Sequence, residues 1–369
     1  MRVHYKNLNS VRCIAAFLVV ISHVEQIKKD NDLPNHWNTE SLVFLLSKIG
    51  VALFFVLSGF LITSLLFIEK EKYKSISIKN FYLKRVLRIW PLYFFIIFMA
   101  LFVFTQIPLL HYNSTHGFWD DGREHLLPNI LLFVFFLPNL QALLYGSVRY
   151  AGQVWSIGVE EQYYLFWPWV MKKTKTIKRL KLIIISLIAF FILLKISLIK
   201  ISYIVHNDNL ILFLHFLKRQ FPIHTILIGC YFAVLNHEKN TREFLTKKSV
   251  QVVSYLVLIA LVVSQSQFKG FYWEVYAFVF GVIIMNLVNK TSIINLEFKP
   301  IAYLGKISYG IYMYHMVLIA IVVRGITTNN ILIYILSFGL TIIVASLSYE
   351  LVEKRILNFK DKISKVHTS

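Results

Sequence analysis

The stretch LNSVRCIAAFLVVISHV (residues 8–24) is an apolar run with one cation, Arg12, near its start and one histidine, His23, near its end. Eleven positions separate the two, so on an α-helix they lie roughly 16 Å apart along the axis and face within about 20° of each other. An ionisable group inside a membrane span is costly unless it faces protein or water. We therefore predict a membrane helix that points both side chains into one cavity, although Arg12 alone could be an interfacial anchor and His23 alone a packing residue.

The composition of this 369-residue chain is that of a polytopic membrane protein. Its mean hydropathy is +0.62, and only 16% of its residues are charged. A net charge of +20 would suggest a nucleic-acid partner in a soluble protein. Here the basic residues cluster between apolar runs, as they do in cytoplasmic loops of membrane proteins, so no nucleic-acid partner is expected.

Ten apolar runs predict an all-α fold with about ten transmembrane helices. They cover approximately residues 8–26, 42–66, 85–106, 154–171, 182–203, 221–236, 249–266, 271–289, 305–325 and 330–352. An even number of spans puts both termini on one side of the membrane, and 28 of the 39 Lys and Arg residues fall on that side. The positive-inside rule makes that side cytoplasmic.

This topology divides the chain into a membrane-embedded domain, residues 1–353, and a short basic cytoplasmic tail, residues 354–369. The longest outward connection covers residues 106–153. Because a structureless loop of that length is unusual, we expect a re-entrant or interfacial helix near residues 127–137. Its histidines are too loosely spaced to predict a metal site.

Three basic residues, Lys84, Arg85 and Arg88, cluster where the third span begins. One interpretation is a positive-inside anchor. The other follows from spacing: Arg85 and Arg88 are one helical turn apart, share a face, and could together hold a polyphosphate at a helix N-terminus.

Polar residues also recur at helical spacing in the fourth and ninth spans. Ser156 and Glu160 share a face of the fourth, with Tyr164 one turn further along. A buried carboxylate there could orient a sugar hydroxyl or pair with a cation, whereas Trp155 could equally be a residue of the interfacial aromatic belt. In the ninth span, Ser308, Tyr312 and His315 share a face, which is consistent with a substrate site or with a network that only packs helices.

With Arg12 and His23, four segments in order resemble the acyltransferase-3 family of integral membrane acyltransferases. They are GVALFFVLSGFLIT, FYLKRVLRIWPLY, WSIGVEEQYYLFWP and LGKISYGIYMYH. The resemblance spans nearly the whole chain. It implies about ten membrane helices and an enzyme that O-acetylates surface or exported glycans with acetyl-coenzyme A (acetyl-CoA) from the cytoplasm. The esterase-like C-terminal domain that many members carry is expected to be missing.

The resemblance assigns roles position by position. Arg12 and His23 match the family's Arg-x10-His signature, Arg85 and Arg88 match its paired basic residues, and Trp155, Ser156 and Glu160 match its Trp-Ser-x-x-x-Glu pattern. The sequence departs from the family pattern at three positions, Asn9, Ala52 and Lys84, where many members have other residues. These departures affect the expected substrate subclass more than the expected reaction.

The leading hypothesis is acyl transfer, with acetyl as the expected group, from acyl-CoA to a hydroxyl of a surface glycan or lipid-linked precursor. His23 is then the general base, Arg12 stabilises the oxyanion, Glu160 positions the acceptor or tunes His23, and Arg85 and Arg88 bind the phosphates of coenzyme A. The expected substrate-binding residues are Trp155, Ser156, Tyr164, Ser308, Tyr312 and His315.

This enzyme would sit in the cytoplasmic membrane as a multi-pass protein in contact with lipid, without a metal or a tightly bound cofactor. Two alternatives use the same charged residues without chemistry: a transporter or flippase for lipid-linked sugars, and a membrane scaffold or sensor. A transporter would often show a weak internal repeat, and none is visible in the sequence.

Overall fold

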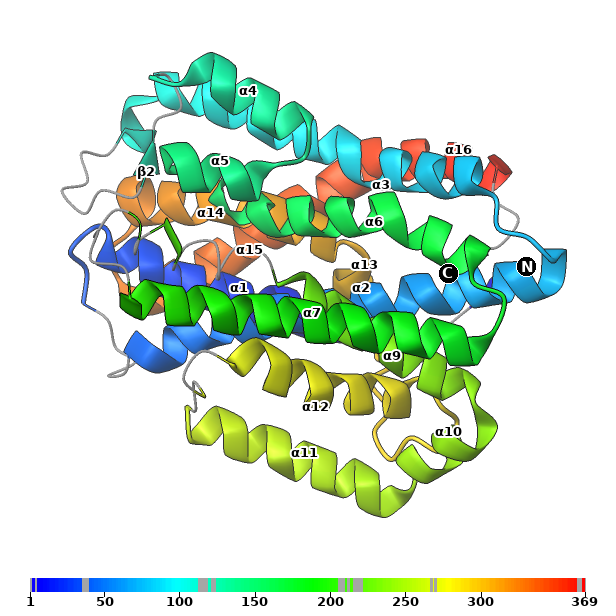
Figure 1. Cartoon of the computed structure of the whole chain (residues 1–369). Helices are drawn as coiled ribbons and strands as arrows, with labels where there is room; N and C mark the ends of the chain where they lie inside the picture. The colour runs from blue at the N-terminus through cyan, green and yellow to red at the C-terminus, as the bar shows by residue number, and fades with distance from the viewer. Residues whose placement is uncertain are drawn as a thin grey trace.

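The computed structural model describes residues 2–3, 5–34, 40–111, 119–120, 124–204, 210, 213–214, 222–265, 268, 271–363 and 367–368. The described chain is almost entirely helical, as predicted (Figure 1). The principal helices are α1 (Leu8–Lys29), α2 (Glu40–Tyr73), α3 (Ile78–Phe98), α4 (Leu126–Val134), α5 (Pro138–Tyr145), α6 (Trp155–Lys173), α7 (Ile177–Ile204), α9 (Ile223–His237), α10 (Lys239–Leu245), α11 (Lys248–Val263), α12 (Tyr272–Leu287), α13 (Lys299–Lys306), α14 (Ser308–Ile321), α15 (Asn330–Ser348) and α16 (Lys354–Ile363).

Shorter elements join or extend these helices. Three π-helical segments, η1 (Met99–Val103), η6 (Val322–Ile326) and η7 (Tyr349–Glu353), continue α3, α14 and α15, and a short 3-10 turn, η4 (Gly152–Val154), leads into α6. Strands β1 (Arg2–Val3) and β4 (His367–Thr368) pair in parallel, as do β2 (Trp119–Asp120) and β3 (Ser147–Val148). The β1–β4 pair brings the two ends of the chain together, and Figure 1 shows both termini at one end of the bundle and β2 at the other.

Helix α2 is the most enclosed of the long apolar helices. In its most apolar window 78% of residues are buried, against 11% in α7 and 22% in α15. The outward sides of α7 and α15 carry exposed apolar residues such as Leu182, Phe190 and Ile335. Apolar faces of this kind suit contact with lipid, so α7 and α15 are peripheral, while α1 and α2 lie inside the bundle.

Each of the ten predicted ranges contains a helix, but the count of ten membrane spans is not confirmed. Six helices in the described part of the chain are long and apolar enough to cross a membrane, or seven if the bent pair α10–α11 is one span. Helices α9 and α12 are shorter, with 15 and 16 residues. Helix α6 is not among the six, and it carries four charged residues, Glu160, Glu161, Lys172 and Lys173. The structure also places a helix, α4, where residues 127–137 predicted one.

Two glycines let α2 and α9 cross at close range. A Cβ added to Gly59 would lie 2.0 Å from the carbonyl oxygen of Ile226, and one added to Gly229 would lie 2.1 Å from that of Val56. Small residues at a crossing allow membrane helices to pack backbone against backbone. This contact fixes the part of α2 that holds Ser58, the residue next to Gly59.

The start of α1 is held by polar contacts with the segment between α12 and α13. Asn7 has a left-handed backbone (φ 65°). Its side chain accepts a hydrogen bond from the Leu296 amide at 2.6 Å and donates one to the Leu287 carbonyl at 2.8 Å. Since Asn7 immediately precedes α1, these bonds fix where the first turns of the helix, and therefore Arg12, are placed.

Candidate active site

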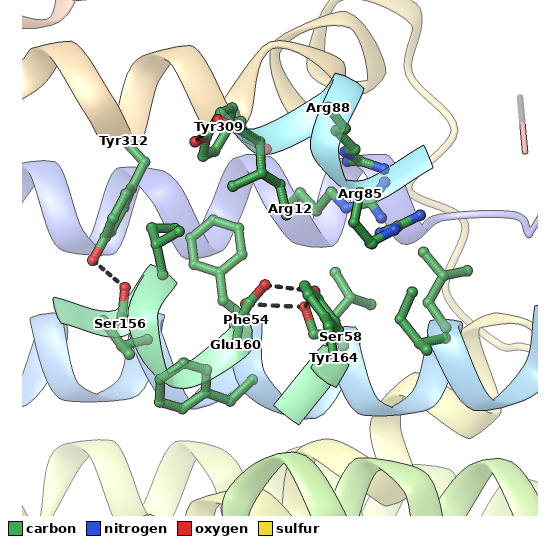
Figure 2. Close-up of a pocket in the computed structure, with 18 residues that line it drawn as sticks. Arg12, Phe54, Ser58, Arg85, Arg88, Ser156, Glu160, Tyr164, Tyr309 and Tyr312 are labelled. Atoms are coloured by element: carbon green, nitrogen blue, oxygen red, sulfur yellow. Dashed lines mark hydrogen bonds between the residues drawn. The ribbon is translucent and has the colours of Figure 1, made fainter. Parts of the chain in front are cut away.

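Five helices, α1, α2, α3, α6 and α14, enclose a cavity of about 100 Å³ (Figure 2). Its polar lining combines cations, hydroxyls and one carboxylate, namely Arg12, Ser58, Arg85, Arg88, Ser156, Glu160, Tyr164, Ser308, Tyr309 and Tyr312. All the site residues predicted from the sequence line this cavity except His23, Trp155 and His315. The structure thus brings together residues from four distant segments of the chain.

Three arginines gather in one part of the cavity wall. Figure 2 shows Arg12 of α1 beside Arg85 and Arg88 of α3. Arg12 donates a hydrogen bond from Nη1 to Asn9 Oδ1 at 2.9 Å. The Arg85 guanidinium lies 5.8 Å from the ring centroid of Phe81 and 5.6 Å from that of Tyr164, within the range of cation–π contact. All three side chains are half-buried.

Within the part of the chain that the structure describes, none of the three arginines forms an ion pair, and Arg88 has no hydrogen-bond partner. The Nε atom of Arg85 is buried and also lacks one among those residues. Like charges gathered in a half-buried wall are costly unless an anion compensates them. The arrangement therefore suits an anionic ligand, and guanidiniums match phosphate and carboxylate groups in geometry.

Glu160 faces the same cavity but is engaged by hydroxyls. Tyr164 donates from its hydroxyl to Glu160 Oε2 at 2.6 Å, and Ser58 donates to Oε1 at 3.0 Å (Figure 2). The carboxylate thereby ties α6 to α2. The prediction that Glu160 tunes His23 has no support in the described contacts, because its hydrogen bonds are made to Tyr164 and Ser58.

Ser156 and Tyr312 form a second polar contact across the cavity, between α6 and α14. Their hydroxyl oxygens lie 2.8 Å apart, and the Tyr312 hydroxyl oxygen lies 2.9 Å from the Gln153 carbonyl oxygen. The Ser156 hydroxyl oxygen also lies 3.3 Å from the Gln153 carbonyl oxygen, so one of the two hydroxyls donates to that carbonyl and the other donates to its neighbouring hydroxyl. Both hydroxyl hydrogens are then used inside the protein, so these residues can offer a substrate only their oxygen lone pairs.

His23 lies further along α1 than the cavity reaches. Its Nδ1 is 2.8 Å from Nε2 of His315, and the two rings stack with centroids 4.9 Å apart. His315 is completely buried and follows Tyr312 by one turn of α14. The expectation that Arg12 and His23 point into one cavity was thus wrong in one respect. The two share a helix face, but three turns of helix separate them, and His23 does not line the cavity.

Trp155 also lies outside the cavity lining. Its ring packs against Phe55, at 6.0 Å between centroids, and against Trp273 of α12, at 6.3 Å. Successive residues on a helix point about 100° apart, so Ser156 faces the cavity while Trp155 points into the neighbouring core. The prediction that Trp155 contacts substrate has no geometric support here.

Two polar residues of the site were missed by the sequence analysis. Ser58 holds Glu160, and Tyr309 lines the cavity while donating from its hydroxyl to the Ile89 carbonyl at 2.8 Å. Ser58 lies in the quoted segment GVALFFVLSGFLIT, where an isolated serine among apolar residues was the available signal. Tyr309 lies next to Ser308 in the ninth span and had no distinguishing spacing.

Comparison with known proteins gives two consistent results. A family model described as an acyltransferase domain matches residues 5–350. Relatives include the peptidoglycan O-acetyltransferase OatA of Listeria monocytogenes, 28% identical over 332 residues, and the O-acetyltransferase OatA of Staphylococcus aureus, 28% identical over 339 residues. These alignments cover 84% of this chain and 51% and 52% of the relatives, so the chain spans about half the length of the relatives it matches. No solved structure matches the chain.

Proposed function

The chain belongs to this acyltransferase family, and from that membership we propose that it transfers an acetyl group from acetyl-CoA to a hydroxyl of a cell-wall glycan. Relatives named as O-acetyltransferases, one of them acting on peptidoglycan, support the acceptor class. The single structural observation that carries the proposal is the cavity in which Arg12, Arg85 and Arg88 gather without an ion-pair partner among the described residues. We propose that the enzyme works in the cytoplasmic membrane.

The arginines support a donor with several negative charges. Coenzyme A carries phosphates at one end and its thioester at the end of a long flexible arm. Arg85 and Arg88, one turn apart on α3, suit the phosphates. Arg12 contributes a third cation to the same wall, and it is the residue of α1 that points toward the other two in Figure 2. The arm would then run toward Ser156 and Tyr312.

His23, which does not line the cavity, is the proposed base. In the reaction, the acceptor oxygen attacks the thioester carbonyl carbon, the C–O bond forms and the C–S bond breaks. His23 accepts the hydroxyl proton and returns it to the departing sulfur. The roughly 16 Å along α1 between Arg12 and His23 suits a donor whose charged head and reactive carbon are far apart.

The test is an assay of the purified protein with acetyl-CoA labelled in the acetyl group and with isolated cell-wall glycan. We expect label to appear in the glycan as an ester that mild alkali releases. His23→Ala should reduce turnover by about 10² to 10⁴ while leaving donor binding intact, because a general base contributes that much to the rate.

Two controls separate chemistry from binding. Measuring acetyl-CoA binding to His23→Ala by calorimetry shows whether the cavity still forms. The exposed lysine variant Lys173→Ala, at the end of α6, should behave like the unaltered protein. Near-normal turnover in His23→Ala would refute the assigned base, and failure of the unaltered protein to label any glycan would refute acetyl transfer to this acceptor.

A further inference from the structure

His315 is a histidine without contact with the cavity, and its two ring nitrogens have different partners. Nδ1 lies 2.7 Å from the backbone carbonyl oxygen of Tyr312, and Nε2 lies 2.8 Å from Nδ1 of His23. A carbonyl oxygen can only accept a hydrogen bond. Nδ1 of His315 must therefore carry a proton.

The surroundings favour the neutral form of the His315 ring. His315 is completely buried, and neither histidine forms an ion pair with a carboxylate in the described chain. Burial without a counter-charge disfavours an imidazolium. A neutral imidazole protonated at Nδ1 presents an unprotonated Nε2, which can only accept. The bond between the rings then runs in one direction: His23 donates from Nδ1 to His315 Nε2.

This direction determines which nitrogen of His23 can react. With its proton on Nδ1, neutral His23 keeps a lone pair on Nε2, the nitrogen that is not bonded to His315. We propose that His315 is a positioning residue, which holds His23 in the Nδ1-protonated tautomer so that Nε2 is the atom that takes the hydroxyl proton. The inference rests on the proposed acetyl transfer and replaces the predicted substrate contact of His315.

Tyr312 connects this pair to the cavity. Its side chain lines the cavity, and its carbonyl fixes the tautomer of His315. The carbonyl belongs to the backbone of α14, three residues before His315, so it is held by the helix itself. A rigid chain of contacts therefore runs from the cavity wall to the ring of His23, which is the kind of support that preorganises a catalytic base.

A packing role for the two histidines is the competing explanation, because buried polar pairs also hold membrane helices together. The variants His315→Gln and His315→Asn separate the two roles. The glutamine carbonyl reaches the former position of Nε2 and can accept from His23. The asparagine side chain is one methylene shorter, so it stays near Tyr312 and cannot reach His23. Both amides remain polar and are smaller than imidazole.

We expect His315→Asn to lower kcat by about 10²-fold, the smaller end of a general base's contribution, with the KM values for donor and glycan unchanged. His315→Gln should recover most of that rate. The matched control is His237→Asn, which removes a histidine that stacks on Phe67 at the end of α9, far along the chain from the pair. Equal kcat in His315→Asn and the unaltered protein would overturn the proposal, as would a raised glycan KM with unchanged kcat.

A second measurement does not depend on turnover. Nitrogen-15 spectra of histidine-labelled protein distinguish a ring protonated at Nδ1 from one protonated at Nε2. We expect both His23 and His315 in the Nδ1-protonated form, and a mixture at His23 in His315→Asn. An Nε2-protonated His23 in the unaltered protein would overturn the proposal even if the variants fail to fold. If the unaltered protein transfers no acetyl group but the spectra are as expected, the proposed function fails and the assigned tautomers stand.

Discussion

Glu160 determines how much positive charge the cavity can offer a ligand. It is a carboxylate among three arginines, and an ion pair with any of them would take one guanidinium away from an incoming ligand. Its two oxygens instead accept hydrogen bonds from Tyr164 and Ser58. The hydroxyls hold the carboxylate in place without changing its charge, so the guanidiniums remain available to an incoming anion.

At the residue scale, we predict that Arg85→Ala combined with Arg88→Ala weakens donor binding. Each charge-assisted phosphate contact contributes about 1.5 to 3 kcal/mol, so the KM for acetyl-CoA should rise at least about tenfold. The maximal rate should change less, because both guanidiniums line the cavity and the proposed base does not. Initial-rate kinetics with varied acetyl-CoA measure both quantities.

The matched control is Arg179→Ala, an exposed arginine of α7 that is outside the cavity lining. It removes the same side chain from the surface of the bundle and should leave the KM unchanged. If the well-folded double variant binds the donor with normal affinity, Arg85 and Arg88 do not bind the donor and serve only as positive-inside membrane anchors.

Relations between residues of the same helix were predictable from the sequence, and contacts between residues of different helices were not. The spacing of Arg85 and Arg88, or of Ser156 and Glu160, is a property of a single helix and can be read from the sequence. The partner of His23 is 292 positions away, and Ser58 is 102 positions from Glu160. Such pairs follow from how helices pack, which a period of 3.6 residues does not specify.

At the element scale, the α2–α9 crossing supports the wall that carries Ser58. We predict that Gly59→Ala lowers the thermal stability, because its Cβ would meet the Ile226 carbonyl at 2.0 Å and backbone atoms cannot move aside cheaply. Overpacking of this kind costs typically 1–3 kcal/mol. The displaced Ser58 should also reduce acetyl transfer. Unfolding followed by tryptophan fluorescence and the transfer assay measure the two effects.

Gly339 provides the comparison for this variant. It lies within α15, and an added Cβ would meet nothing within 4 Å. Alanine is the better helix former by about 1 kcal/mol. Gly339→Ala should therefore be neutral or stabilising, and equal destabilisation by both substitutions would mean that the crossing is not what makes Gly59 sensitive.

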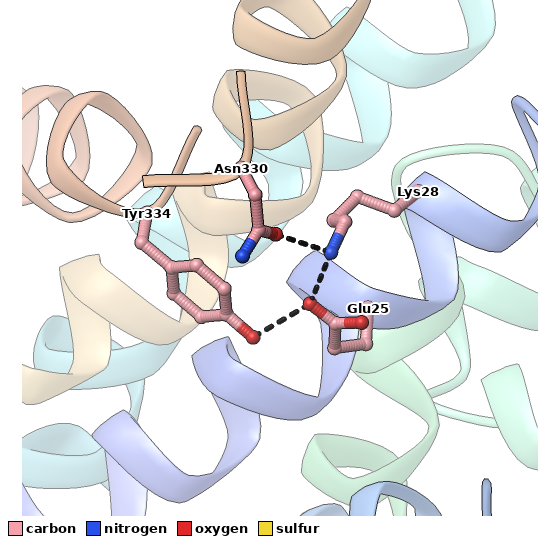
Figure 3. A network of polar contacts seen from close by, with 4 residues as sticks. All are labelled: Glu25, Lys28, Asn330 and Tyr334. Carbon is pink, nitrogen blue, oxygen red and sulfur yellow. Dashed lines mark hydrogen bonds and ion pairs between the residues drawn. The ribbon is translucent and has the colours of Figure 1, made fainter. Parts of the chain in front are cut away.

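A second element-scale contact joins α1 to α15 through a buried ion pair. Lys28 Nζ lies 2.7 Å from Glu25 Oε1 and 2.5 Å from Asn330 Oδ1, and the Tyr334 hydroxyl donates to Glu25 at 2.7 Å (Figure 3). We predict that Lys28→Met destabilises the protein by about 3–5 kcal/mol, the usual effect of leaving a buried charge unpaired. Thermal unfolding in detergent measures the loss.

Removing both charges should behave differently. Replacement of a buried pair by apolar residues is often neutral or stabilising, so Glu25→Leu combined with Lys28→Met should recover most of the lost stability. Glu243→Gln, which breaks the exposed pair Lys239–Glu243 of α10, should change the unfolding temperature little. A double variant as unstable as Lys28→Met would show that the hydrogen bonds to Asn330 and Tyr334, and not the unpaired charge, dominate.

Helix locations were predictable from apolar runs, but helix ends were not. The second span was predicted over residues 42–66, whereas α2 continues to Tyr73 through a charged segment. Lys70 explains the extension, because its ammonium donates to the carbonyls of Met171, at 2.6 Å, and Thr174 at the end of α6. A hydropathy profile detects an apolar segment and does not detect a helix that continues into a charged segment held by a polar partner.

At the scale of the whole molecule, the arrangement of the ends agrees with an even number of membrane crossings. The β1–β4 pair places both termini together, and β2, within residues 106–153, lies at the opposite end of the bundle (Figure 1). The distribution of Lys and Arg assigns the end with the termini to the cytoplasm, and this assignment remains a prediction.

Cysteine labelling in intact cells tests the orientation. The native cysteines, Cys13 and Cys230, are both buried, and replacing them with alanine provides a background without thiols. In it, Glu124→Cys should react with a membrane-impermeant maleimide added outside, because Glu124 is exposed and lies in the segment predicted to face out. Lys175→Cys, at an exposed position between α6 and α7, should react only after the cells are opened. Labelling of Lys175→Cys from outside would show that the topology is inverted, and the three cavity arginines could then not serve a cytoplasmic acetyl-CoA as proposed.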